Sequence, residues 1–113
     1  MSAYSKALRH EFFAALGLGL KVVWPVLSGL IGTVIALGIT IGILEGWPVF
    51  DSIYFSLITA LTIGYGDFAP KLDITRLLAI LIGVCGLLLT ATVAAVGVKA
   101  LTTALEKENI EID

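Results

Sequence analysis

The sequence predicts an all-α membrane protein in which two helices cross the bilayer and a shorter segment between them enters the membrane and returns. The chain has 113 residues, of which 58% are hydrophobic and only 14% charged, and its mean hydropathy is +1.04. These values are typical of membrane proteins. Two long uncharged runs, 22–44 and 77–98, flank a shorter apolar run at 52–66.

The two long runs have the length of membrane-crossing helices. Each has about 22 residues, which reach about 33 Å as an α-helix. We expect the first span at 22–44 and the second at 74–99, the second being capped by Asp73. The Gly-Trp-Pro sequence at 46–48 is expected to end the first span, with Trp47 at the level of the lipid headgroups.

The shorter run is bounded by Asp51 and Asp67. It has roughly 15 residues, too few to cross the hydrocarbon layer. We expect a helix at 51–61 capped by Asp51, whose partially negative C-terminal end faces the bilayer centre. The glycine-rich segment 62–67 follows at membrane depth. Irregular backbone is tolerated there only where protein buries it or where it lines a wet cavity.

The distribution of positive charge predicts the orientation of the chain. Only Lys71 and Arg76 lie on the segment that connects the spans, and the other basic residues flank the spans near the two ends of the chain. By the positive-inside rule, both termini are cytoplasmic and the connection faces outward across the cell membrane. These flanking residues are Lys6, Arg9, Lys21, Lys99 and Lys107.

The terminal segments are expected to lie outside the bilayer core. Residues 1–20 have an apolar helical face and predict a short helix lying at the cytoplasmic membrane interface. A signal peptide is disfavoured, because Lys21 interrupts the apolar run and no clear cleavage pattern follows. The acidic segment 100–113 is expected to form a cytoplasmic tail whose end is a frayed helix.

The residues Thr62-Ile63-Gly64-Tyr65-Gly66-Asp67 resemble the TVGYG signature loop of potassium channels. The resemblance implies that 1–113 is a single pore domain: an outer helix at 22–44, a pore helix at 51–61, a selectivity filter at 62–67 and an inner helix at 74–99. It implies that the backbone carbonyls of the filter replace the water shell of K⁺, helped by the hydroxyl of Thr62. The ion-binding residues implied are Thr62, Ile63, Gly64 and Tyr65, within a filter that extends to Gly66.

The same resemblance implies a particular backbone conformation in the filter and a particular oligomeric state. Carbonyls alternate in direction along a strand, so pointing them at one axis requires alternating left- and right-handed backbone, which Gly64 and Gly66 permit. The side chains of Ile63 and Tyr65 are expected to point away from the axis and to pack against the pore helix. One chain supplies one loop, so a ring of carbonyls requires a cyclic oligomer, which the resemblance makes a homotetramer.

Residues behind the filter depart from the pattern of some family members. Those members carry a tryptophan pair where Tyr54 and Phe55 stand, and a glutamate where Ile58 stands. Phe55 has no polar atom with which to bond Tyr65, whereas the phenol of Tyr54 could reach Asp67. We therefore take Tyr54, Phe55 and Asp67 as the candidates for filter support.

Glycines in the spans allow two interpretations. Gly86 falls where related channels bend the inner helix, and it predicts either a gating hinge or close helix packing. Thr90 and Ala94 lie one and two helical turns farther on and are candidates for lining a cavity. Gly38 and Gly42 in the first span predict close packing of helices.

The predicted function is passive, K⁺-selective conduction. The alternatives are a less selective monovalent cation channel and a nonconducting membrane partner subunit. An enzyme is disfavoured, because His10 is the only histidine and no nucleophile–base pair is apparent. A formal net charge of −2 without a basic patch argues against nucleic-acid binding. The expected partners are K⁺, membrane lipid and three further copies of the chain, with no cofactor.

Overall fold

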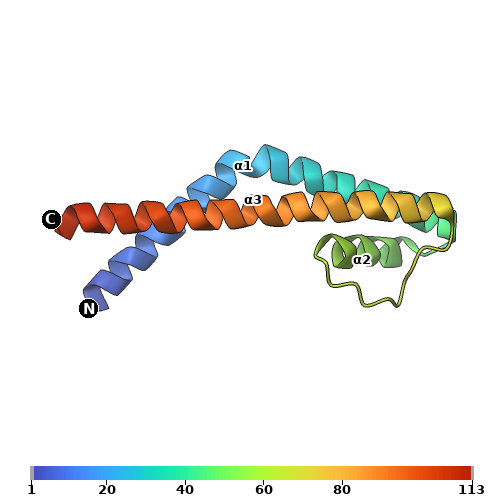
Figure 1. The fold of residues 1–113 in the computed structure, drawn as a ribbon, viewed down its shortest axis with the longest axis horizontal. Coiled ribbons are helices and arrows are strands. Elements are labelled where there is room, and N and C mark those ends of the chain that lie inside the picture. The colour runs from blue at the N-terminus through green and yellow to red at the C-terminus, as the bar shows by residue number, and fades with distance from the viewer. Residues whose placement is uncertain (1, 113) are drawn as a thin grey trace. The chain divides into compact units, whose positions relative to one another are not determined.

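The computed structural model describes residues 2–112, which form three α-helices: α1 (Ser2–Glu45), α2 (Val49–Ala60) and α3 (Asp73–Ile112) (Figure 1). The all-α class and the order long, short, long are confirmed. Both α1 and α3 contain a stretch apolar enough to cross a membrane, and only 28% and 11% of those stretches are buried. Such low burial is unlike the core helix of a soluble domain. The chain divides into two compact units, one of them continuous from Val26 to Thr90.

The continuous unit, 26–90, contains the end of α1, all of α2, the loop that follows it and the start of α3. Side chains from all three helices form its core, and α2 packs directly against both long helices. The buried members are Val34, Ile41, Phe55, Ala60 and Ile82. Around them pack Leu37, Trp47, Phe68, Leu78, Ala79, Cys85 and Leu89.

Close packing of α1 on α2 depends on two glycines. A Cβ on Gly42 would lie 2.6 Å from the Cβ of Ser52, and a Cβ on Gly38 would lie 2.7 Å from the Cβ of Ser56. Both serines are buried. Each bonds a carbonyl one turn back on its own segment, at 3.0 Å for Ser52 and 2.7 Å for Ser56. The expected role of Gly38 and Gly42 in packing is confirmed.

The starts of α2 and α3 differ from the expectation. α2 begins at Val49 after Pro48, and no side chain caps it, so Asp51 lies within the first turn. Proline suits this position because its fixed φ is compatible with the helix start and its missing N–H would have no helical partner. Asp51 still favours the helix through its charge near the N-terminus. Asp73 is likewise the first residue of α3 and not its cap.

Glu45, the last residue of α1, binds the start of α3. Its Oε1 accepts hydrogen bonds from the backbone N–H of Lys71 at 2.7 Å and of Leu72 at 3.0 Å, and from the hydroxyl of Thr75 at 2.6 Å. A negative carboxylate is favourable at a helix N-terminus. Glu45 therefore ties the end of α1 to the two residues that precede α3 and to the first turn of that helix.

The second unit consists of the ends of the chain, up to Pro25 and from Ala91 onward. The helix expected at 1–20 is not separate, because α1 runs unbroken from Ser2 through Lys21 and contains Pro25. A lysine interrupts an apolar run without interrupting a helix, since its helix propensity is high. The tail is also helical, because α3 continues to Ile112.

The two helix ends in this unit contact each other in antiparallel fashion. A Cβ on Gly19 would lie 2.7 Å from Cγ1 of Val96, and farther from the spans Lys107 forms a 3.1 Å ion pair with Glu11. Both partners of this pair retain exposure, so its contribution to stability is small. The interfacial location of 1–20 stays a prediction.

Candidate functional site

In the loop that follows α2, residues 62–67, the sign of the backbone angle φ alternates along the chain. The φ angle is positive at Thr62 (61°), Gly64 (60°) and Gly66 (83°), whereas Ile63 and Tyr65 keep negative values. The left-handed region is favourable for glycine and costly for a β-branched residue such as threonine. Positive φ at Gly64 and Gly66 was expected from the sequence, and positive φ at Thr62 was not. Alternation over these five residues is the pattern that brings successive carbonyls to one side of a strand.

Backbone hydrogen bonds attach the first half of this loop to the end of α2. The N–H of Ile63 donates to the carbonyl of Ile58 at 2.8 Å, the N–H of Gly64 donates to the same oxygen at 3.3 Å, and that of Thr62 donates to Thr59 at 3.1 Å. The Thr62 hydroxyl donates to the Leu61 carbonyl at 2.6 Å. The N–H groups of Thr62, Ile63 and Gly64 thus face α2 and bond two of the last carbonyls of that helix.

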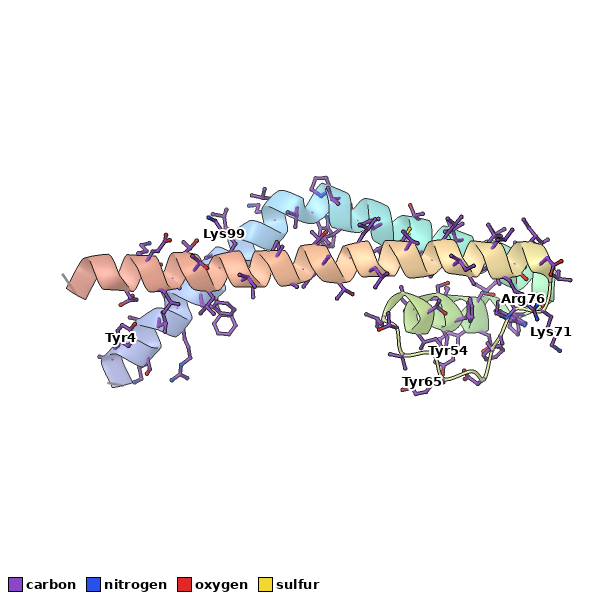
Figure 2. All side chains as sticks on the ribbon, viewed as in Figure 1. Tyr4, Tyr54, Tyr65, Lys71, Arg76 and Lys99 are labelled. Atoms are coloured by element: carbon purple, nitrogen blue, oxygen red, sulfur yellow. The ribbon has the colours of Figure 1, made fainter. Side chains whose placement is uncertain are left out.

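The side chains of Ile63 and Tyr65 are exposed in the single chain, at 47% and 70%. Their packing against the pore helix stays a prediction, although the charge of Tyr65 contributes to the raised pKa of Tyr54 on α2. The backbone of Ile63 faces α2, since its N–H bonds Ile58. Figure 2 shows Tyr65 on the loop.

Asp67 is held at the other end of the loop. Its Oδ2 accepts a 2.9 Å hydrogen bond from the Tyr54 hydroxyl, and its Oδ1 accepts a 3.2 Å bond from the N–H of Phe68. The contact between Tyr54 and Asp67 is therefore confirmed, and Figure 2 shows Tyr54 on α2 near the loop. The bond to Asp67, followed by desolvation and the carboxylate's charge, raises the pKa of Tyr54.

Substituting Asp67 with asparagine is expected to lower the pKa of Tyr54 toward its ordinary value of 10.0. Because the folded pKa is raised, the bond stabilises the fold below the ordinary pKa, and this stabilisation is lost as the pH rises through the folded pKa. The difference in tyrosinate absorbance between each protein and its Tyr54→Phe counterpart isolates this titration. Asp51→Asn, on the same helix, is the control and should leave the titration unchanged. An equal pKa in Asp67→Asn and wild type would contradict the assignment.

An aromatic cluster, which we define as Trp47, Tyr54, Phe55 and Phe68, lies beside Asp67. The Trp47 ring centroid lies 5.1 Å from that of Phe55 and 5.2 Å from that of Phe68, and those of Tyr54 and Phe68 are 6.2 Å apart. Trp47 packs against the buried core, and its expected location at the level of the lipid headgroups stays a prediction. Phe55 contacts Trp47, which in turn contacts Phe68, and the role of Phe55 in filter support stays a prediction. Sequence reasoning missed Phe68, although an aromatic residue directly after Asp67 was a visible signal.

Gly86 lies against the end of α2. It is buried, and a Cβ there would meet the Ala60 carbonyl oxygen and lie 2.6 Å from the Ala60 Cα. Helix α3 is continuous through this position. Of the two interpretations, the contact favours close packing. Thr90 and Ala94 are exposed, and their role in lining a cavity stays a prediction.

Comparison with known proteins agrees with this arrangement. The model of a protein family described as an ion channel matches residues 27–103, which include α2, the loop and the adjoining parts of both long helices. The chain belongs to this ion-channel family. The match covers every residue of the loop and of the aromatic cluster.

Two relatives of this ion-channel chain match over short segments. Probable potassium channel protein 2 of Methanocaldococcus jannaschii is 50% identical over 40 residues, which are 35% of this chain and 12% of that protein. Two-pore potassium channel 5 of Arabidopsis thaliana is 46% identical over 37 residues, 33% of this chain and 9% of that protein. The matched segments are thus a small part of either relative. No solved structure matched the chain.

Proposed function

We propose that four copies of this chain form a K⁺-selective channel that conducts K⁺ passively across the cell membrane. The observation that carries the proposal is the alternation of positive φ at Thr62, Gly64 and Gly66 within a Thr-Ile-Gly-Tyr-Gly sequence. The names of the two relatives, both potassium channels, support the choice of ion.

The energetics of an ion in a membrane explain why carbonyls are needed. By the idealised Born estimate, moving a bare ion into a low-dielectric medium costs of order 20 kcal/mol, whereas 100 mV supplies only about 2.3 kcal/mol. Substitute oxygens must therefore replace the hydration shell. The extended segment from Thr62 to Gly66 reaches about 15 Å, which gives room for several successive rings of carbonyls.

Several copies are required to close each ring. One chain contributes one loop, and the exposure of Ile63 and Tyr65 leaves two large side chains for neighbouring copies to cover. We assign the K⁺ sites to the carbonyls of Thr62, Ile63, Gly64 and Tyr65, with the Thr62 hydroxyl at the inner end. The four C-terminal ends of α2 add negative potential beneath these sites. Both termini lie in the cytoplasm, and Asp67 lies at the outer mouth.

The measurement of reversal potential tests this function directly. Purified protein in a defined bilayer, with K⁺ on one side and Na⁺ on the other, is expected to show a reversal potential far from zero in the direction of K⁺ selectivity. Equal permeabilities would replace the proposal with a less selective cation channel. Absence of current, together with absence of ⁸⁶Rb⁺ uptake by loaded vesicles, would favour a nonconducting partner subunit.

A further inference from the structure

The Trp47 ring bridges the buried core and the loop that follows Asp67. It packs edge to face on Phe55 at an interplanar angle of 62° and on Phe68 at 68°. Phe55 is only 4% exposed and belongs to the core, whereas Phe68 directly follows Asp67. Trp47 itself lies between α1 and α2. Trp47 thus contacts both the core and Phe68, which itself packs at the edge of the core beside the outer end of the proposed filter.

Trp47 is itself fixed in position. Its backbone N–H donates to the carbonyl of Gly42 at 2.8 Å, and Gly46 has a φ of 78° where α1 ends. This left-handed ending sets the direction in which the chain leaves the helix. Because its backbone is bonded and its ring lies against Phe55, Trp47 can resist displacement of Phe68.

The contacts described for the loop lie at its two ends. At the inner end, the Ile58 carbonyl holds the N–H groups of Ile63 and Gly64. At the outer end, the Tyr54 hydroxyl bonds Asp67, and Trp47 contacts Phe68. The Tyr54–Asp67 bond is exposed to solvent, where water competes for both partners. The contact between the Trp47 and Phe68 rings, in which no polar group exchanges with water, is a second anchor.

We propose that Trp47 is a positioning residue that holds the outer end of the filter in its ion-selective form through Phe68. The inference rests on the proposed function and adds two residues to Tyr54, Phe55 and Asp67. Carbonyl dipoles that converge on one axis repel one another unless a cation lies between them. A filter whose outer end is released can relax its carbonyl spacing, which reduces discrimination between K⁺ and Na⁺, most strongly when few ions occupy it.

Trp47→Leu and Phe68→Leu test the proposal by reversal potential and by the stability of the current at low and high external K⁺. Each variant is expected to assemble and conduct, with a permeability ratio of K⁺ to Na⁺ reduced at least roughly 3-fold, the effect that loss of a single aromatic pair supports, since each of four subunits loses one pair. The current should decay in low external K⁺ and be sustained in high K⁺. The loss in the double variant should be smaller than the sum of the two single losses, because both variants remove the Trp47–Phe68 contact, although each also removes one further ring contact, Trp47–Phe55 or Tyr54–Phe68.

Two matched variants complete the experiment. Phe50→Leu removes an aromatic ring that is 80% exposed and lies near Trp47 in sequence, and it should leave the permeability ratio unchanged. Trp47→Phe keeps a ring at the position and should restore most of the selectivity that Trp47→Leu loses. If Trp47→Leu fails to assemble, Phe68→Leu and Trp47→Phe decide the question.

The outcomes separate this inference from the proposed function. A wild-type channel that does not distinguish K⁺ from Na⁺ overturns the proposed function. A selective wild type whose Trp47→Leu and Phe68→Leu variants keep its permeability ratio and its response to external K⁺ overturns only the role of Trp47. If Phe50→Leu loses as much selectivity as Trp47→Leu, the role of Trp47 is also overturned, since the effect would then not depend on the contact between Trp47 and Phe68.

Discussion

Replacing Gly64 with alanine is expected to abolish K⁺-selective current. Gly64 has a φ of 60°, and left-handed backbone costs an L-residue with a Cβ roughly 1–2 kcal/mol. Four copies of the loop raise this cost to roughly 4–8 kcal/mol in a tetramer, enough to change the conformation of the filter. Because no atom of the chain lies within 4 Å of the added Cβ, the backbone angle alone produces the effect within one subunit.

Gly32→Ala is the matched control for this substitution. Gly32 lies in α1, and an added Cβ there also meets no atom within 4 Å, but its φ is not positive. Alanine is a better helix former than glycine, so this variant should keep its selective current. Bi-ionic recordings compare the two variants with wild type. A Gly64→Ala channel as selective and as conductive as wild type would refute the assignment of the filter.

Replacing Gly86 with alanine is expected to destabilise the pore. The new Cβ would meet the backbone of Ala60, at 2.6 Å from its Cα, and neither helix can yield at that point without moving its neighbours. Overpacking of this kind typically costs about 1–3 kcal/mol. The thermal stability of the purified protein, followed by tryptophan fluorescence and by the retention of the oligomer, measures this loss.

Gly83→Ala supplies the comparison for Gly86→Ala on the same helix. A Cβ at Gly83 meets no atom within 4 Å, so alanine there should be neutral or stabilise α3 by up to about 1 kcal/mol. If Gly86 were a gating hinge with no role in packing, the two variants would give different results from those expected here. Gly86→Ala would then melt like Gly83→Ala and differ only in the fraction of time the channel is open, which would contradict our interpretation.

The order of the helices could be predicted because a long uncharged run indicates a helix that can cross the lipid bilayer. Helix boundaries were less predictable where a distant residue intervenes. Glu45 binds the N–H of Lys71, 26 residues away, and no local pattern reveals such a contact. Helix α2 starts after Pro48 and is not capped by Asp51. Proline and aspartate both indicate a helix start, and because they lie close together here, the local sequence does not show which of them marks it. Lys21 interrupts the run of apolar residues but does not end the helix, which continues through it.

The loop was predictable where residue type determines backbone conformation. Glycine at 64 and 66 indicates positive φ, whereas Thr62 adopts it against its own preference. The hydrogen bonds of Thr62 to Leu61 and Thr59 accompany this conformation. The Tyr54–Asp67 bond followed from a phenol that could reach a carboxylate. The position of Trp47 did not follow, because an aromatic residue near a span boundary suits the membrane surface and a buried cluster equally.

The central claim is that backbone oxygens of several copies of 62–65 converge on one axis and replace the hydration of K⁺. Anomalous diffraction from crystals soaked in Rb⁺ or Tl⁺ tests it most directly. We predict a column of cation peaks along a symmetry axis, each surrounded by carbonyl oxygens of Thr62, Ile63, Gly64 or Tyr65. Well-ordered loops with no peaks on such an axis would contradict the account.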